Sequence, residues 1–223
     1  MAVRVGLILG LCRQNDVAAC GSCPRPGERT RAAAHCSGRL TIEYMAATTS
    51  QVRTVEEFRR LPQYDGPVYH ELRHGEIVAV TRPKFKHSLI QRTLRRLLEE
   101  LADPASFVDT EVSFRPLPEF ELWVADVAYL SAERFSEVDP EDNVRGAPDL
   151  VIEGLSPSNT VDEMNDRERI CLENGAQEFW VVDAKRRQVK ISRLDGHTTT
   201  WRAGQQFPLP LFGGAYLAVD AIF

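Results

Sequence analysis

The stretch 149–183 constrains the fold of this chain more than any other. Its first part, Asp149–Leu155, is a short apolar run with Val-Ile at its centre, which is typical of a buried strand. A capping box at Thr160–Glu163 predicts the start of a helix, and Gly175 predicts its end. Glu178–Asp183 then predicts a second strand. A strand–helix–strand unit favours a right-handed crossover, so we expect an α/β fold with a mixed β-sheet flanked by helices.

Similar patterns predict further elements on both sides of this unit. The predicted helices are a short one after the capping box Thr54–Glu57 and a longer one over Lys86–Ala102. The predicted strands are Val68–Arg73, Glu76–Thr81, Ser106–Arg115, Glu121–Leu130 and Gln188–Leu194, with an acidic loop at Ser136–Gly146.

The first 44 residues differ in composition from the rest of the chain. They hold four of the five cysteines and show no sustained hydrophobic periodicity. Cys20-Gly-Ser-Cys23, with a His and a Cys nearby, is compatible with a zinc half-site or a redox pair, but it is the only clean ligand pair. We therefore expect residues 1–44 to be a disordered N-terminal extension and residues 45–223 to form one domain.

The charge and hydropathy of the chain argue against a dedicated nucleic-acid-binding protein and against a membrane protein. Residues 45–223 contain 21 basic and 29 acidic side chains, a net charge of −8, whereas a dedicated nucleic-acid binder usually presents a basic face. A nuclease remains compatible with this charge, because metal ions can neutralise a cluster of carboxylates. No apolar run approaches the roughly 20 residues that span a bilayer, so no membrane association is expected. Only Cys171 lies in the domain, which indicates a reduced, cytoplasmic protein.

Two acidic residues stand inside predicted strands. Asp126 lies in Trp-Val-Ala-Asp-Val-Ala-Tyr, and Glu153 lies in Leu-Val-Ile-Glu-Gly-Leu. An ionised carboxylate in apolar surroundings needs a cation, a metal or a hydrogen-bond donor. Two such groups on neighbouring strands would suit a hard divalent ion that acts on a phosphodiester. The alternative is that each faces solvent or pairs with an arginine.

The block from Ala147 to Thr160, Ala-Pro-Asp-Leu-Val-Ile-Glu-Gly-Leu-Ser-Pro-Ser-Asn-Thr, resembles the signature of the Uma-two family of restriction endonucleases. Tyr69–Glu76 resembles the opening hairpin of that family, His87 its next helix start, and Leu172–Asp183 its helix-to-strand passage. The similarity runs from about Thr54 to the C-terminus. It implies a restriction-endonuclease-like fold of the PD-(D/E)XK superfamily, Mg²⁺ (or Mn²⁺) as cofactor, and hydrolysis of DNA.

The resemblance also implies roles for individual residues. Asp126 corresponds to the metal-binding Asp of the superfamily, Glu153 to its second carboxylate, and Glu71 to an auxiliary acid. The superfamily Lys would stand at Leu155; in Uma-two proteins it lies in the following helix, where this chain has Arg167. An arginine keeps the positive charge but cannot act as a base.

Two hypotheses about function follow. In the first, Mg²⁺ binds Asp126 and Glu153, and Arg167 stabilises negative charge that develops on the phosphodiester. In the second, loss of the lysine leaves a catalytically impaired nuclease fold that serves as a binding or scaffold module. Superfamily members often dimerise, so a homodimer is a further expectation. Asp149 follows a Pro and is interpreted as a structural turn residue, with a supporting role in the site as the alternative.

Overall fold

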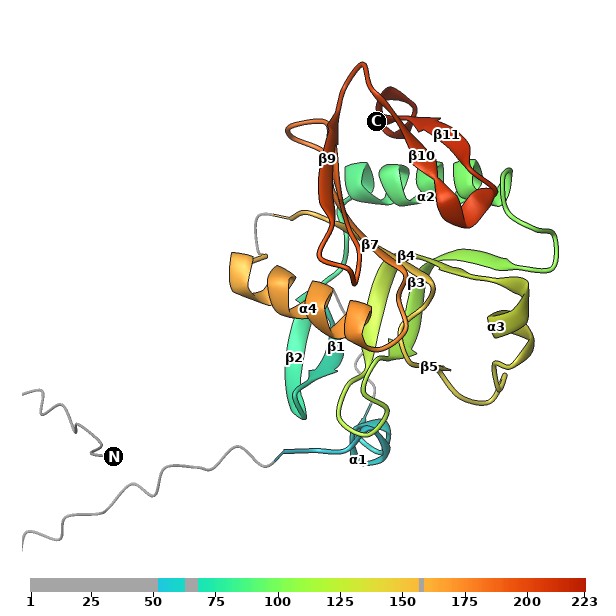
Figure 1. Ribbon diagram of the computed structural model, residues 1–223. Helices are drawn as coiled ribbons and strands as arrows, with labels where there is room; N and C mark the ends of the chain where they lie inside the picture. The colour runs from blue at the N-terminus through green and yellow to red at the C-terminus, as the bar shows by residue number, and fades with distance from the viewer. Residues whose placement is uncertain (1–51, 63–67, 157–158) are drawn as a thin grey trace, which may run out of the picture. The chain divides into compact units, whose positions relative to one another are not determined.

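A seven-stranded mixed sheet forms the centre of the protein (Figure 1). The computed structural model describes residues 52–62, 68–156 and 159–223, so the predicted extension 1–44 lies outside the described residues. The strand order is β5–β3–β4–β6–β7–β8–β9. These strands are β3 (Phe107–Arg115), β4 (Trp123–Leu130), β5 (Val144–Arg145), β6 (Leu150–Gly154), β7 (Glu178–Asp183), β8 (Gln188–Ser192) and β9 (Thr198–Arg202).

The predicted strand–helix–strand unit is confirmed. β6 and β7 pair in parallel, with Ile152 beside Trp180, and α4 (Val161–Glu173) connects them. Thr160 caps α4 through a complete capping box, because its hydroxyl accepts from the Glu163 amide and the Glu163 carboxylate accepts from the Thr160 amide. The carboxyl ends of β6 and β7 therefore lie side by side at one edge of the sheet, where the chain leaves each strand.

Helices and the C-terminal segment cover the two faces of the sheet. One face packs against α2 (Phe85–Glu99), together with the hairpin of β10 (Gln206–Leu209) and β11 (Ala215–Ala218), and Figure 1 shows these elements together. The opposite face packs against α4, whose Met164, Ile170, Cys171 and Leu172 are buried. Two hydrophobic cores therefore lie on either side of the strands that carry Asp126 and Glu153.

A separate hairpin and a short helix complete the described fold. β1 (Val68–Arg73) and β2 (Glu76–Thr81) form the predicted hairpin, and Leu72 bridges to Leu122 just before β4. The predicted capping box at Thr54 is confirmed and begins α1 (Val55–Arg59). Within the described ranges, no helix is both long and apolar enough to cross a membrane.

Some elements differ from the sequence-based expectations. The predicted acidic loop begins inside a short helix, α3 (Ala132–Ser136), and its end contributes the edge strand β5. No element was predicted for β9, nor for the hairpin of β10 and β11. The C-terminal segment contains Pro208, Pro210 and two adjacent glycines, which interrupt the alternation that predicts a strand. Its short strands are stabilised by packing against α2 instead.

Candidate active site

Four elements bring the predicted site residues together. Glu71 is on β1, Asp126 on β4, Glu153 on β6 and Arg167 on α4. Glu71, Glu153 and Arg167 form one network of ion pairs, while Asp126 forms a neighbouring cluster with residues of α2. The site thus has two halves, one on each face of the sheet.

Asp126 faces α2, and the alternation of β4 breaks directly after it. Ala125 and Ala128 both pack in the core beside α4, whereas Val127 packs in the core beside α2. Glu111, which stands opposite Asp126 on β3, has a left-handed φ of 53°, and the β3–β4 ladder is interrupted there. Distortions of this kind re-aim a side chain, and they are frequent next to active sites.

The Asp126 carboxylate receives three hydrogen bonds. Its Oδ1 accepts from Gln91 Nε2 at 2.8 Å, and its Oδ2 lies 2.8 Å from His87 Nε2. Oδ2 also accepts from the backbone amide of Gly154 at 2.6 Å. The side chains of Asp126 and His87 are 22% and 23% exposed, so this cluster is open to solvent.

Gly154 is required by the close approach of β6 to this cluster. A Cβ at this position would overlap the His87 ring and lie 3.1 Å from Asp126 Oδ2. The glycine of the Glu-Gly sequence therefore allows His87, Asp126 and the end of β6 to meet.

Arg167 forms the centre of the other half. Its Nε donates to Glu153 Oε1 at 2.9 Å, its Nη1 donates to Glu71 Oε2 at 3.1 Å, and its Nη2 donates to the Val124 carbonyl at 2.6 Å. The guanidinium also lies 5.0 Å from the centroid of the Trp123 ring. Only 9% of the Arg167 side chain is exposed. Each of its three side-chain nitrogens therefore donates within the protein.

Glu71 is the most deeply buried acid of the site. Besides Arg167, it accepts from Arg73 Nη2 at 2.7 Å and from the Val124 amide at 2.8 Å. Burial alone would raise the pKa of Glu71, but Arg167 and Arg73 outweigh it and hold the pKa below its ordinary value. Glu71 therefore stays ionised and balances the charge of Arg167.

Glu153 carries less compensation than Glu71. Burial raises the pKa of Glu153 to about 8, Arg167 opposes this effect, and the negative charges of Asp126 and Glu71 add to it. By contrast, the hydrogen bond to Asp126 raises the pKa of His87 against the effect of burial. The surroundings of Glu153 therefore disfavour its ionisation, while Asp126 favours the protonated form of the partly exposed His87.

Sequence reasoning missed several residues of this site. No motif marks Gln91, which is one polar residue among others in the sequence of α2. His87 is indicated only by the family resemblance. Tyr69 lies close enough to the site for the charge of Glu71 to help burial raise its pKa. Asp149, interpreted as a structural residue, accepts hydrogen bonds from the Ser131 amide and the Gln177 side chain, away from this site.

The donor set fits a hydrated ion better than a closed metal cage. Among the described residues, no three His, Cys, Asp or Glu side chains are grouped to hold a metal ion. Mg²⁺ usually keeps several waters and takes only one or two carboxylates. Asp126 and Glu153 would supply two, and each carboxylate oxygen can accept more than one partner.

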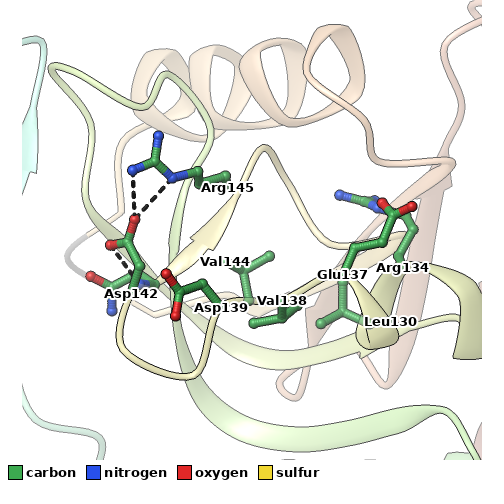
Figure 2. A pocket seen from close by; sticks show the side chains of 9 residues that line it. Leu130, Arg134, Glu137, Val138, Asp139, Asp142, Val144 and Arg145 are labelled. Carbon is green, nitrogen blue, oxygen red and sulfur yellow. Dashed lines mark hydrogen bonds and ion pairs between the residues drawn. The ribbon is translucent and has the colours of Figure 1, made fainter.

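Apart from this site, a hollow of about 210 Å³ is lined by residues in and around the predicted acidic loop (Figure 2). Its most engaged acid is Asp142, which pairs with Arg59, Arg115 and Arg145. Burial would raise the pKa of Asp142, but these arginines and the Asn143 amide hold it well below its usual range. Asp142 is thus compensated within the fold and carries no feature of a metal or catalytic site.

The mixed sheet, its covering helices and the two strand acids define a restriction-endonuclease-like protein. The model of the Uma2 family, described as "Putative restriction endonuclease", matches residues 55–220, and the chain belongs to this family. A crystal structure titled as a putative nuclease belonging to DUF820, from Anabaena variabilis ATCC 29413, has a TM-score of 0.64 and 23% sequence identity. The match covers 76% of this chain and 97% of that one, and it shows that the two share a fold. No curated protein matches the chain.

Proposed function

We propose that this protein is a DNA endonuclease that hydrolyses phosphodiester bonds with the help of a divalent ion. Membership of the Uma2 family supports a nuclease. The observation that carries the proposal is that β4 and β6 bring Asp126 close enough for its charge to act on Glu153, while the amide of the adjacent Gly154 donates to Asp126 at 2.6 Å. There the pKa of Glu153 is about 8, because of its burial and of the nearby negative charges, and a cation would relieve this excess.

In this proposal, Asp126 and Glu153 hold Mg²⁺, or Mn²⁺ in its place. The bound ion would neutralise charge on the phosphodiester and activate a water for attack. The residues around it have separate tasks. Gln91 and the Gly154 amide orient the Asp126 carboxylate, and Arg167 fixes Glu153 in place.

His87 is the residue that we assign to the substrate. Its hydrogen bond with Asp126 favours the protonated imidazole, and its side chain is partly exposed beside that acid. A protonated imidazole can donate to a phosphate oxygen and stabilise negative charge there. Arg167, expected from the sequence to stabilise that charge, already donates to Glu153, Glu71 and Val124. We therefore assign Arg167 to positioning, with Glu71 as the acid that holds it.

The test is a plasmid-nicking assay on the full chain with Mg²⁺, with Mn²⁺ and with chelator. We expect metal-dependent nicking that falls at least about 100-fold in Asp126→Asn, because one metal ligand and the partner of His87 are lost. Asp109→Asn is the matched control, since Asp109 is a half-exposed acid on the adjacent strand β3 that pairs only with Arg95 among the described residues. Equal nicking by wild type and Asp126→Asn would refute the proposal.

A second candidate function is a nuclease fold that binds without cutting. The observation in its favour is that the position of the family lysine holds an arginine whose three side-chain nitrogens all donate within the protein. If Arg167→Lys creates nicking activity where the wild type has none, the binding module is the correct function of the natural chain. If the wild type nicks DNA and Arg167→Lys changes the rate, the enzyme is correct.

A homodimer belongs to this proposal as well, because two copies would bring one site to each strand of a duplex. Light scattering on the full chain, with and without duplex DNA, measures the mass directly. A mass of one chain in both conditions would remove the dimer from the account and leave a nicking enzyme.

A further inference from the structure

A groove of about 330 Å³ lies between α2 and the turn that joins β7 to β8. The first half of α2 forms one wall, with Lys86, Leu89 and Ile90, and the turn forms the other, with Lys185 and Arg187. The C-terminal Phe223 contributes to the groove as well. The groove therefore has an apolar lining with cationic side chains along it.

The charge of this groove is unusual for the molecule. Its nine lining residues include three cations and no Asp or Glu, although residues 45–223 have a net charge of −8. Arg187 pairs with Asp220 at 2.8 Å and lies over the Phe223 ring, which fixes its position. Within the part of the chain that the structure describes, the ammonium groups of Lys86 and Lys185 are exposed and form no ion pair. Both remain available to an anionic partner.

The groove and the candidate active site are formed by neighbouring stretches of chain. Lys86 directly precedes His87 in α2. On the other wall, Val182 of β7 pairs with Gly154 of β6 and accepts from the Leu155 amide at 2.9 Å, and Lys185 follows three residues later. Both walls of the groove therefore belong to stretches of chain that also form or adjoin the site.

We propose that this groove holds the sugar–phosphate backbone of DNA next to the bond that is cut. This inference rests on the proposed nuclease function and adds the surface that positions the substrate. Lysines at the mouth of a groove bind phosphates through charge and independently of sequence. Such contacts fix the register of the strand relative to the cutting residues. The hollow of Figure 2 offers no equivalent, because three acids, Glu137, Asp139 and Asp142, line it beside its arginines.

The test is the salt dependence of binding, measured on the full chain in chelator by fluorescence anisotropy with a labelled duplex oligonucleotide. In Lys86→Ser/Lys185→Ser, we expect about tenfold weaker binding and a salt slope that is smaller by about 2, since each lost phosphate contact lowers the slope by about 1. The control is Arg60→Ser/Arg145→Ser, which removes two exposed cations around α1 and β5, away from α2 in Figure 1. Its affinity and slope should match the wild type.

Each outcome separates this inference from the proposed function. If the lysine variant keeps the wild-type slope, or if the control loses as much, the groove is not the backbone site, even when nicking is intact. If the wild type does not nick but the lysine variant alone loses affinity and slope, the groove stands and the nuclease proposal fails. Matching circular dichroism and melting curves show that both variants are folded.

Discussion

The two halves of the candidate site differ in how many of their charged groups are ion-paired and in how far their side chains are exposed. Around Arg167, every charged group has a partner, and the side chains of Glu71 and Arg167 are 1% and 9% exposed. Around Asp126, the partners are a neutral amide, a backbone N–H and a titratable His87, and about a fifth of each acidic and imidazole side chain is exposed. Glu153 joins the two halves.

This difference indicates that the Arg167 half contributes mainly to stability and the Asp126 half mainly to chemistry. A buried network in which each charged group has a partner holds the four elements of the site in place. The half around Asp126 has fewer charged partners and access to solvent, and Lys86 of the cationic groove directly precedes its His87. We therefore expect substitutions on the Arg167 side to affect folding first and substitutions on the Asp126 side to affect metal and DNA first.

The largest effect is expected for Arg167→Met. It leaves the buried Glu71 and Glu153 without their shared cation, which typically costs about 3–5 kcal/mol of unfolding free energy. Urea denaturation measures this loss. Arg169→Met is the matched control two residues along α4. Arg169 is 54% exposed and, among the described residues, its ion pairs are with Asp166 and Glu173 on the same helix, so the loss should be much smaller. Equal losses in the two variants would abolish the proposed contrast.

The next effect is expected for Gly154→Ala. The added Cβ meets the His87 ring, so we expect a loss of about 1–3 kcal/mol in stability and at least about 100-fold in nicking, since the His87–Asp126 pair is displaced. A double-mutant cycle with His87→Ala should recover most of the stability and none of the nicking. If the double variant is as unstable as the sum of the single ones, the two residues do not meet as described.

A smaller effect is expected from pH. Because the pKa of Glu153 is about 8 in the metal-free protein, this carboxyl is protonated in the folded state between about pH 5 and 8 and ionised in the unfolded one. Its contribution to stability is therefore present at low pH and is lost as pH rises through 8. A metal ion must displace the proton, so its apparent affinity should rise up to about tenfold per pH unit below 8 and level off above it. Calorimetry at pH 6.5, 7.5 and 8.5 measures this; a flat profile contradicts it.

The smallest effect is expected for Gln91→Leu. It removes one neutral hydrogen bond to Asp126 and keeps the volume of the buried side chain, so the cost in stability should be about 1 kcal/mol. Urea denaturation of Gln91→Leu and Arg167→Met compares the loss of unfolding free energy in the two halves of the site. A loss as large as that of Arg167→Met would mean that the Asp126 side is as structural as the other.

Much of the fold could be predicted from local patterns. The capping boxes at Thr54 and Thr160, the His74-Gly75 turn and the apolar runs of β4 and β6 each specify their element within a few residues of chain. The edge strand β5 could not be predicted, because it has two residues and pairs with β3, which is distant in sequence. Strand β9 is mostly polar, and the hairpin of β10 and β11 is interrupted by prolines and glycines, so neither shows the apolar alternation of a strand. The parallel pairing of β6 and β7 followed from the helix between them.

The site was predictable in its residues but less so in its arrangement. Acids inside apolar strands pointed to Asp126 and Glu153, and helical spacing placed Arg167 on the buried face of α4 with Met164 and Cys171. The interruption of the β3–β4 ladder at Glu111 and Asp126 is indicated by no local pattern. The commitment of Arg167 to two acids and a carbonyl likewise depends on tertiary contacts, and so does the role of Gln91.

Divalent-ion binding tests the central claim most directly. Isothermal titration of the full chain at pH 8.5 compares the wild type with Asp126→Asn, Glu153→Gln and the control Asp109→Asn. The account predicts that Mg²⁺ and Mn²⁺ bind the wild type and Asp109→Asn, and that both site variants lose at least about tenfold in affinity, since each removes one carboxylate ligand. Unchanged affinity in Asp126→Asn and Glu153→Gln would contradict it and leave the two acids as parts of the fold.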